Sequence, residues 1–298
     1  MDRLTKFARA VFLTLGTLCA LSGAAAFAQP AAPNYQGLWW AAPAGSQPGW
    51  GINFAHQGDI IFATWFTYGT QYNAKWLFMQ ANKTAEGVYS GTLAQNVGPP
   101  YSSSPFDSSV VMPAPFTGSA TLTFDSPNTG TVTYQPGSTI IVQPITRQVF
   151  GPLPTCVWGA QADLSKATNY TDLWWASPPG TESGWGVNLT HQGTTIFATW
   201  FTYAFQGASV WFSVTASQTG PNTYSGILYL TSGPAWGTIP YDSSVVSYVA
   251  VGSASFVFTD GNAATFAYNV GFQGGGGATS QIKAITRQVF RAPGTVCQ

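Results

Sequence analysis

Apolar and polar residues alternate in short runs along most of the chain, and turn-forming residues separate the runs. In residues 50–56, for example, Trp50, Ile52, Phe54 and His56 fall on one face of an extended segment, because successive side chains of a strand point to opposite sides. No segment keeps the period of an amphipathic helix. The pattern predicts an all-β protein, whose first strands lie near residues 37–41, 50–56, 59–68, 75–81, 87–94, 118–124, 130–135 and 140–150.

The same pattern occurs twice along the chain, as an internal sequence repeat. The segments GWGIN, HQG, IFATWFTY and ITRQVF of residues 49–150 recur as GWGVN, HQG, IFATWFTY and ITRQVF in residues 184–290. The offset is 135 residues at first and 140 at the end, and a glycine run at 274–277 together with its neighbours accounts for the extra length. The repeat predicts two tandem domains, residues 29–150 and 170–298, joined by a linker at 151–169. We expect each copy to fold by itself.

Each copy holds about eight consecutive strands. An up-and-down barrel suits such a meander, because closure removes the exposed strand edges; a two-sheet sandwich is the alternative. Eight strands leave an interior wide enough for side chains or one small ligand. The exception to the short turns is the loop at residues 95–117, which is rich in Pro and Ser. Its aromatic residues Tyr101 and Phe106 favour a packed lid at the barrel mouth.

The first 28 residues are typical of a secretory signal peptide. Residues 1–9 are basic, residues 10–21 are apolar, and Ala26-Phe27-Ala28 forms a small-x-small cleavage site. The apolar run is too short to cross a bilayer. Bulky Leu18 before Cys19 argues against lipidation. We therefore expect an exported protein, located in the periplasm or outside the cell.

Charge narrows the range of partners. Charged residues are 7% of the chain and aromatic residues 15%, so a folded core is expected under a surface of uncharged polar groups. Cleavage after Ala28 would leave 7 Lys and Arg against 9 Asp and Glu, a net charge of −2. Nucleic acids and anionic membranes are therefore poor partners. The sequence Gly98-Pro99-Pro100 and the lack of lipid-facing bands disfavour an integral outer-membrane barrel.

Two cysteines remain after such cleavage, Cys156 and Cys297. Each follows an ITRQVF segment by six or seven residues, at the equivalent exit point of its copy. Because export leads to an oxidising compartment, we expect them to form one disulfide.

The histidines and the loop aspartates favour structural roles. Each copy has a single histidine, His56 or His191, directly before a Gln-Gly turn; we expect a hydrogen bond that stabilises the turn rather than a metal ligand. Asp107 and Asp242 each precede Ser-Ser, an ordinary Asx-turn or cap. The alternative for these aspartates is a charge partner for the arginine of the ITRQVF segment.

Catalytic patterns are missing from the sequence. Asp59 and Glu182 have no acidic counterparts in the other copy, so a pair of carboxylates in both copies is not expected. No serine stands in a Gly-x-Ser-x-Gly context. We predict no catalytic residue, no cofactor and no metal.

The first and last strands carry a recognisable signature. Gly37-x-Trp39 together with Arg147 resembles the calycin signature of lipocalins and avidins, although in copy two Asp172 replaces the glycine before Trp174 and Arg287. The resemblance implies barrels in which the tryptophan plugs one end and the arginine packs over it. The repeated segments as a whole are similar to a group of secreted proteobacterial repeat proteins, a resemblance that implies the domain and leaves the activity open.

Tryptophans remain as the candidate binding residues. If one end is plugged, a ligand must enter at the opposite mouth, near the long loop. We expect a binding or adhesion protein with aromatic-lined sites for a small apolar, aromatic or sugar ligand. A structural component of a cell-surface assembly, contacting a surface protein, and a secreted hydrolase are the alternatives. The predicted ligand-binding residues are Trp50, Trp65, Tyr68 and Trp76, with Trp185, Trp200, Tyr203 and Trp211 in copy two.

Overall fold

The structure is a computed structural model that describes residues 33–116, 118–271 and 278–298. The expected signal peptide, Cys19 and the glycine run at 274–277 lie outside the described residues. Within these ranges nearly all regular structure is strand, and the helical elements are short 3-10 turns. The prediction of an all-β chain is confirmed.

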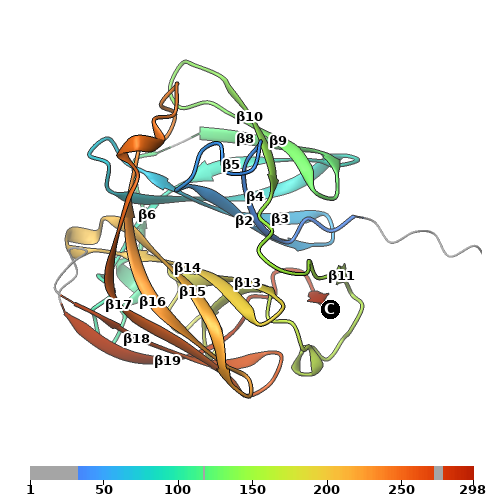
Figure 1. Cartoon of the computed structure of the whole chain (residues 1–298), viewed down its shortest axis with the longest axis vertical. Helices are drawn as coiled ribbons and strands as arrows, with labels where there is room; N and C mark the ends of the chain where they lie inside the picture. Colours follow the sequence, from blue (N-terminus) through green and yellow to red (C-terminus); the bar gives the residue numbers. More distant parts are fainter. Residues whose placement is uncertain (1–32, 117, 272–277) are drawn as a thin grey trace, which may run out of the picture. The chain divides into compact units, whose positions relative to one another are not determined.

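Eight strands among the described residues of the first copy close into an antiparallel barrel (Figure 1). Each strand pairs with its neighbour along the chain, and the first also pairs with the last, where Trp39 lies opposite Arg147. The barrel consists of β1 (Gly37–Ala41), β2 (Gly51–Gln57), β3 (Ile60–Tyr68), β4 (Ala74–Ala85), β5 (Val88–Ala94), β8 (Gly118–Ser126), β9 (Thr129–Tyr134) and β10 (Ile141–Arg147).

The second copy repeats this topology with eight described strands of its own. Trp174 lies opposite Arg287 where its first and last strands meet. Its strands are β12 (Asp172–Ala176), β13 (Gly186–Gln192), β14 (Thr195–Tyr203), β15 (Ser209–Gly220), β16 (Thr223–Ser232), β17 (Ser247–Phe258), β18 (Ala263–Val270) and β19 (Thr279–Arg287).

Both copies are therefore up-and-down barrels and not sandwiches. The ladder between β1 and β10 satisfies backbone groups that would form open edges in a sheet. Some predicted boundaries shift: β4 continues to Ala85, and β10 ends at Arg147, before the exposed Val149 and Phe150.

Each barrel is plugged at one end by a tryptophan under an arginine. The Arg147 guanidinium lies 5.0 Å from the centre of the Trp39 ring, and it donates to the backbone carbonyls of Gln36 and Asn34 at 2.5 and 2.6 Å. These bonds satisfy the buried cation. In the second barrel Arg287 lies 5.1 Å from the Trp174 ring. This is the arrangement that the calycin resemblance implies.

Asp172 explains the departure of copy two from that signature. Its carboxylate lies 2.9 Å from Arg287, and both side chains are buried. In the first barrel the equivalent Gly37 has φ +118°, and Arg147 relies on backbone carbonyls alone within the described residues. The buried arginine is therefore satisfied in two ways at equivalent positions: by a carboxylate and backbone carbonyls in the second barrel, and by backbone carbonyls in the first.

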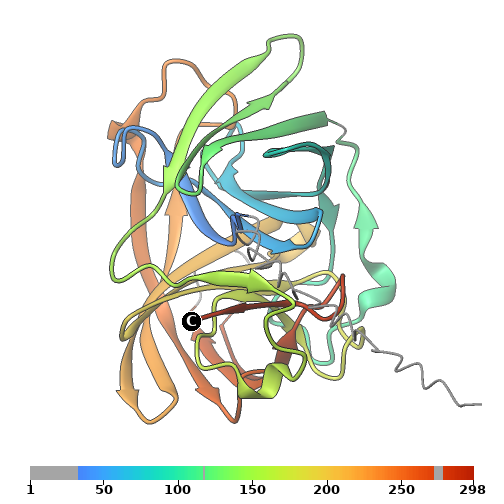
Figure 2. The same ribbon diagram turned by 90° about the vertical axis from the view of Figure 1, so that its right-hand side faces the viewer.

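The predicted disulfide between Cys156 and Cys297 is present. It joins two short strands that pair with each other, β11 (Cys156–Trp158) and β20 (Thr295–Cys297). Figure 2 shows this C-terminal strand, in dark red, beside the yellow-green linker strand. The bond ties the end of the second barrel to the segment that leaves the first.

The two long loops are exchanged between the barrels. We call residues 98–116 the first lid and residues 233–246 the second lid. The N–H of Tyr101 in the first lid donates to the carbonyl of Tyr203 in barrel two, and the N–H of Trp236 in the second lid donates to the carbonyl of Tyr68 in barrel one, both at 2.8 Å. Figure 1 shows the second lid, in orange, against the first barrel. Each lid packs at the mouth of the other barrel.

The outer faces of the two barrels share apolar contacts. Pro33–Gln298 forms one compact unit, in which β4 lies against β15. The indole N–H of Trp76 donates to the carbonyl of Thr202 at 2.8 Å, and that of Trp211 donates to the carbonyl of Thr67 at 2.9 Å. The apolar packing therefore continues from one barrel to the other, and independent folding of each copy stays a prediction.

Candidate functional site

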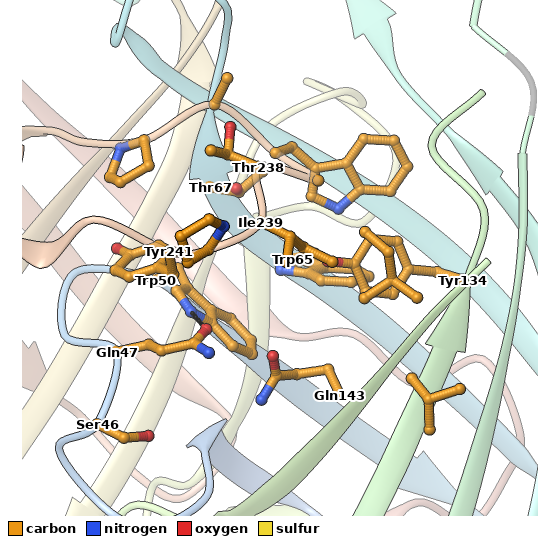
Figure 3. A pocket seen from close by; sticks show the side chains of 17 residues that line it. Ser46, Gln47, Trp50, Trp65, Thr67, Tyr134, Gln143, Thr238, Ile239 and Tyr241 are labelled. Atoms are coloured by element: carbon orange, nitrogen blue, oxygen red, sulfur yellow. Dashed lines mark hydrogen bonds between the residues drawn. The ribbon is translucent and has the colours of Figure 1, made fainter. Parts of the chain in front are cut away.

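The mouth of the first barrel holds a cavity of about 450 Å³ at the end opposite the Trp39 plug. Such a volume lies in the range of about 300–1,000 Å³ that small-molecule sites occupy. Barrel one supplies one wall and the second lid supplies the other (Figure 3). The lining residues are Ser46, Gln47, Trp50, Trp65, Thr67, Tyr134, Ile141, Val142, Gln143, Pro234, Ala235, Trp236, Gly237, Thr238, Ile239, Pro240 and Tyr241.

A cluster of aromatic rings forms the floor of this cavity. The Trp65 ring lies 4.6 Å from Tyr134 and 5.8 Å from Trp236, nearly perpendicular to both. Trp50 lies 5.9 Å from Trp65 on its other side, as Figure 3 shows. Trp65 is buried, whereas Trp50 and Trp236 are only partly buried. Trp50 and Trp236 therefore keep some ring surface available to a ligand, and Trp50 is the one that belongs to the first barrel itself.

The polar groups of the lining are uncharged. Gln47 accepts a hydrogen bond from the indole N–H of Trp50 at 3.1 Å, so its amide nitrogen remains available to donate. The amide nitrogen of Gln143 donates to the carbonyl of Pro144 at 2.9 Å, which leaves its side-chain oxygen to accept. Burial raises the pKa of Tyr134 to about 12, which keeps this phenol neutral. No Asp, Glu, Lys, Arg or His is among the described lining residues.

The equivalent mouth of the second barrel is closed. A space of about 10 Å³ remains there, beside Trp185 and Trp200. Tyr101 of the first lid packs 5.8 Å from the Trp200 ring, and its carbonyl accepts a hydrogen bond from the hydroxyl of Tyr268 at 2.9 Å. Tyr101 occupies the place that Trp236 takes in the first barrel.

An ion pair completes this closure. Lys283 lies 2.9 Å from Glu182, with 14% and 20% of their side chains exposed, and Glu182 also accepts from the indole N–H of Trp185. By the repeat, these charged residues stand where the first copy has Gln143 and Gln47. The second copy therefore has a charged, filled mouth, and the first copy has a neutral, open one.

Two buried indole N–H groups at the first mouth, those of Trp65 and Trp236, have no acceptor within the described part of the chain. The N–H of Trp200, in the closed second mouth, is in the same state. The feature therefore belongs to the packing of the aromatic layer and does not by itself indicate a ligand.

Trp50 and Trp65 line the cavity, and Trp185 and Trp200 hold the same places in the closed mouth. Whether they bind a ligand stays a prediction.

The other predicted ligand-binding residues lie elsewhere. Trp76 packs on the outer face, 5.0 Å from the ring of Phe201 in the other barrel. Tyr68 donates to the carbonyl of Gly49 and packs beneath the second lid. Tyr203 and Trp211 repeat these positions in copy two. This placement follows from strand alternation: Trp76 pairs with outward-facing Phe66, so it does not face the same interior as Trp65.

The histidines serve the barrel ends. Nδ1 of His56 accepts from the N–H of Tyr35 at 3.0 Å, and Nε2 lies 2.8 Å from the carbonyl of Gly58 in the turn. His191 repeats both bonds. The turn-stabilising hydrogen bond is therefore present in both copies.

The aspartates of the lids cap short turns. Asp107 accepts from the N–H of Ser109, ahead of η1 (Ser108–Val110), and Asp242 accepts from that of Ser244, ahead of η4 (Ser243–Val245). The Asx-cap interpretation is confirmed, and the described arginines have other partners.

Sequence reasoning missed Tyr134, Gln143 and Trp236 as parts of the first mouth. Trp236 follows the strands of the second copy in the sequence, but the exchange of lids places it at the mouth of the first barrel. The useful signal was the difference between copies, because Gln47 and Gln143 are replaced by Glu182 and Lys283. The sequence does not show that the two positions face each other across the mouth, and without this the difference between the copies could not be interpreted.

No protein-family model, no curated protein and no solved structure matches this chain. Both resemblances stated from the sequence therefore remain hypotheses. Within the described residues, no helix is long and apolar enough to span a membrane.

Proposed function

We propose that this chain is an exported, non-enzymatic binding protein that takes a small uncharged ligand at the mouth of its first barrel. The observation that carries the proposal is the contrast between the two mouths. On one scaffold, the first mouth keeps a cavity of about 450 Å³ and the second about 10 Å³. A mouth needed only for folding could be filled as the second one is.

The chemistry of the lining supports binding rather than catalysis. Hydrolysis needs a nucleophile beside a base, or two carboxylates across a cleft. The hydroxyls of Ser46 and Thr238 have no histidine or carboxylate beside them among the described lining residues. The secreted-hydrolase alternative therefore receives no support from this site.

One observation favours assembly as a second candidate function. On the second barrel, Tyr248 is 73% exposed, Ile282 is 76% exposed, and Val249 beside Tyr248 is 46% exposed. Large exposed apolar side chains are typical of contact surfaces. A concentration series in sedimentation velocity tests this candidate, because self-assembly predicts a mass that rises with concentration.

Binding itself is tested by titrating the purified protein with neutral sugars, aromatic compounds and aliphatic compounds while following tryptophan emission. We expect one neutral class to bind with a stoichiometry of one per chain. Trp50→Ala should weaken this binding by about 1–3 kcal/mol, because the partly buried ring of Trp50 lines the cavity.

Trp185→Ala is the matched control, since Trp185 holds the equivalent position in the closed mouth. It should leave the affinity unchanged. Binding by none of the three classes, or equal losses in the two variants, would contradict the proposal.

A further inference from the structure

We infer that the ligand of the first mouth is a short neutral saccharide, an inference that rests on the proposed binding function. Three features of the cavity lead to this class: an aromatic platform, amide groups that both donate and accept, and the absence of charge from the described lining.

The aromatic platform suits the apolar face of a sugar ring. Trp50 presents a partly buried indole at the cavity wall, and Trp65 and Tyr134 continue the aromatic surface behind it. Aromatic faces bind the C–H side of a ring by dispersion and by the attraction of polarised hydrogens to the π-system.

The amides exclude a purely apolar ligand. The oxygen of Gln47 accepts from Trp50, and its amide nitrogen has no acceptor among the described residues. The nitrogen of Gln143 donates to the carbonyl of Pro144, and its side-chain oxygen has no donor within the described part of the chain. A hydrocarbon in the cavity would cover both amides without replacing their bonds to water, which is costly for each group. A sugar hydroxyl both donates and accepts, so it can serve either amide.

The lack of charge excludes acidic sugars and phosphates. No Lys, Arg or His is among the described lining residues to pair with an anion, and burying an unpaired charge is strongly unfavourable. The second barrel shows what charge does at this place, because Glu182 and Lys283 there lie 2.9 Å apart across the mouth.

The second barrel also supplies the sharpest test. The double substitution Gln47→Glu with Gln143→Lys installs in the first mouth the ion pair that the second copy already carries. We expect it to leave the thermal unfolding midpoint close to that of the unsubstituted protein and to lower neutral-saccharide affinity at least tenfold. The reverse substitution, Glu182→Gln with Lys283→Gln, is the matched control and should leave the affinity within twofold.

The panel for titration calorimetry contains neutral mono- and oligosaccharides of several configurations, the corresponding uronic acids, simple aromatic alcohols and aliphatic alcohols. The expected result is binding of a neutral saccharide at one site per chain, with the uronic acid at least tenfold weaker. Binding of aromatic or aliphatic alcohols in place of sugars would overturn the saccharide class and leave the binding function standing. Binding of no member would overturn both.

An affinity unchanged by the Gln47→Glu and Gln143→Lys substitutions would place the saccharide elsewhere on the molecule and would overturn the assignment to this mouth. If that variant fails to fold, Gln143→Leu replaces it. This change keeps the size of the side chain while removing the acceptor, and it should weaken saccharide binding while preserving any binding of apolar compounds.

Discussion

At the scale of single residues, the buried histidines link the start of each barrel to its first hairpin turn. His56 is 2% exposed, and its Nδ1 must be unprotonated to accept from the N–H of Tyr35. Its ring also stacks on that of Tyr35, 5.4 Å away, and the hydroxyl of Tyr89 lies 3.1 Å from Nε2. Such a site accommodates the neutral imidazole and opposes the cation.

This environment makes stability depend on pH. Burial is the main cause that lowers the pKa of His56 from 6.5 to about 4, and burial also lowers that of His191. Between pH 6.5 and 4 the unfolded chain therefore binds more protons than the folded one. Stability is fully present above pH 6.5 and is lost as the pH falls to 4, by about 3 kcal/mol for His56.

Urea unfolding at pH 7, 6, 5 and 4 measures this loss. The variant His56→Gln should be less stable at pH 7 but should lose less stability on acidification than the unsubstituted protein. Subtracting the pH-dependent change in unfolding free energy of the variant from that of the unsubstituted protein removes the contribution of the carboxylates, because both proteins have the same carboxylates. Parallel pH profiles for the two proteins would contradict the assignment.

At the scale of elements, two glycines allow each exchanged lid to pack closely against a tyrosine ring of the other barrel. Gly233 begins the second lid, and a Cβ added there would overlap the ring of Tyr68, which is fully buried. Gly98 stands in the same relation to Tyr203. Tyr68 and Tyr203 are thus the surfaces on which the lids pack. This packing explains the burial of the two tyrosines better than contact with a ligand does.

Gly233→Ala should therefore weaken the packing of the second lid on the first barrel. We expect a loss of about 1–3 kcal/mol in the free energy of unfolding, because a methyl group is forced into a packed contact that cannot yield. The lid should also become more sensitive to limited proteolysis.

Gly220→Ala in β15 is the control, since the nearest atom to an added Cβ is there at 3.8 Å. It should change stability by less than about 1 kcal/mol. Equal effects of the two substitutions would show that Tyr68 can move aside and that the contact between Gly233 and Tyr68 is not closely packed.

At the scale of the whole molecule, the two barrels complete one another. The lids are exchanged, and equivalent residues, Trp76 and Trp211, make equivalent hydrogen bonds to the opposite barrel. The disulfide joins the linker to the C-terminal end of the second copy with a sequence separation of 141 residues. On the chain-entropy model such a loop contributes about 4–5 kcal/mol.

This arrangement predicts how a single copy behaves. A fragment of residues 159–298 would expose the face around Trp211 and would lack the lid that carries Tyr101. Because the two interface faces are nearly the same in sequence, the fragment should pair with a second copy of itself about a twofold axis. Sedimentation equilibrium should then give a dimer, and Trp211→Ala should weaken it. A well-folded monomeric fragment would show that each barrel is stable without its partner.

Much of the architecture could be read from the sequence, because it rests on local rules. Strand alternation and the exact repeat of the IFATWFTY segment determined two equal all-β units. Closure followed from the problem of exposed edges, and the equivalent positions of Cys156 and Cys297 indicated their pairing. The structural roles of His56 and Asp107 also followed, since both bond to backbone groups within a few residues.

The tertiary structure alone decided which face of a strand meets which neighbour. Alternation separates Trp65 from Trp76 but does not say that a second barrel covers the outer face, where Trp76 lies. Nor does it say that Trp236 crosses to the other barrel. Gln47 and Gln143 differ from Glu182 and Lys283 in the sequence, yet the difference becomes an open or closed mouth only when residues about 100 positions apart are brought together. Such contacts depend on long-range packing, which a period of two residues does not encode.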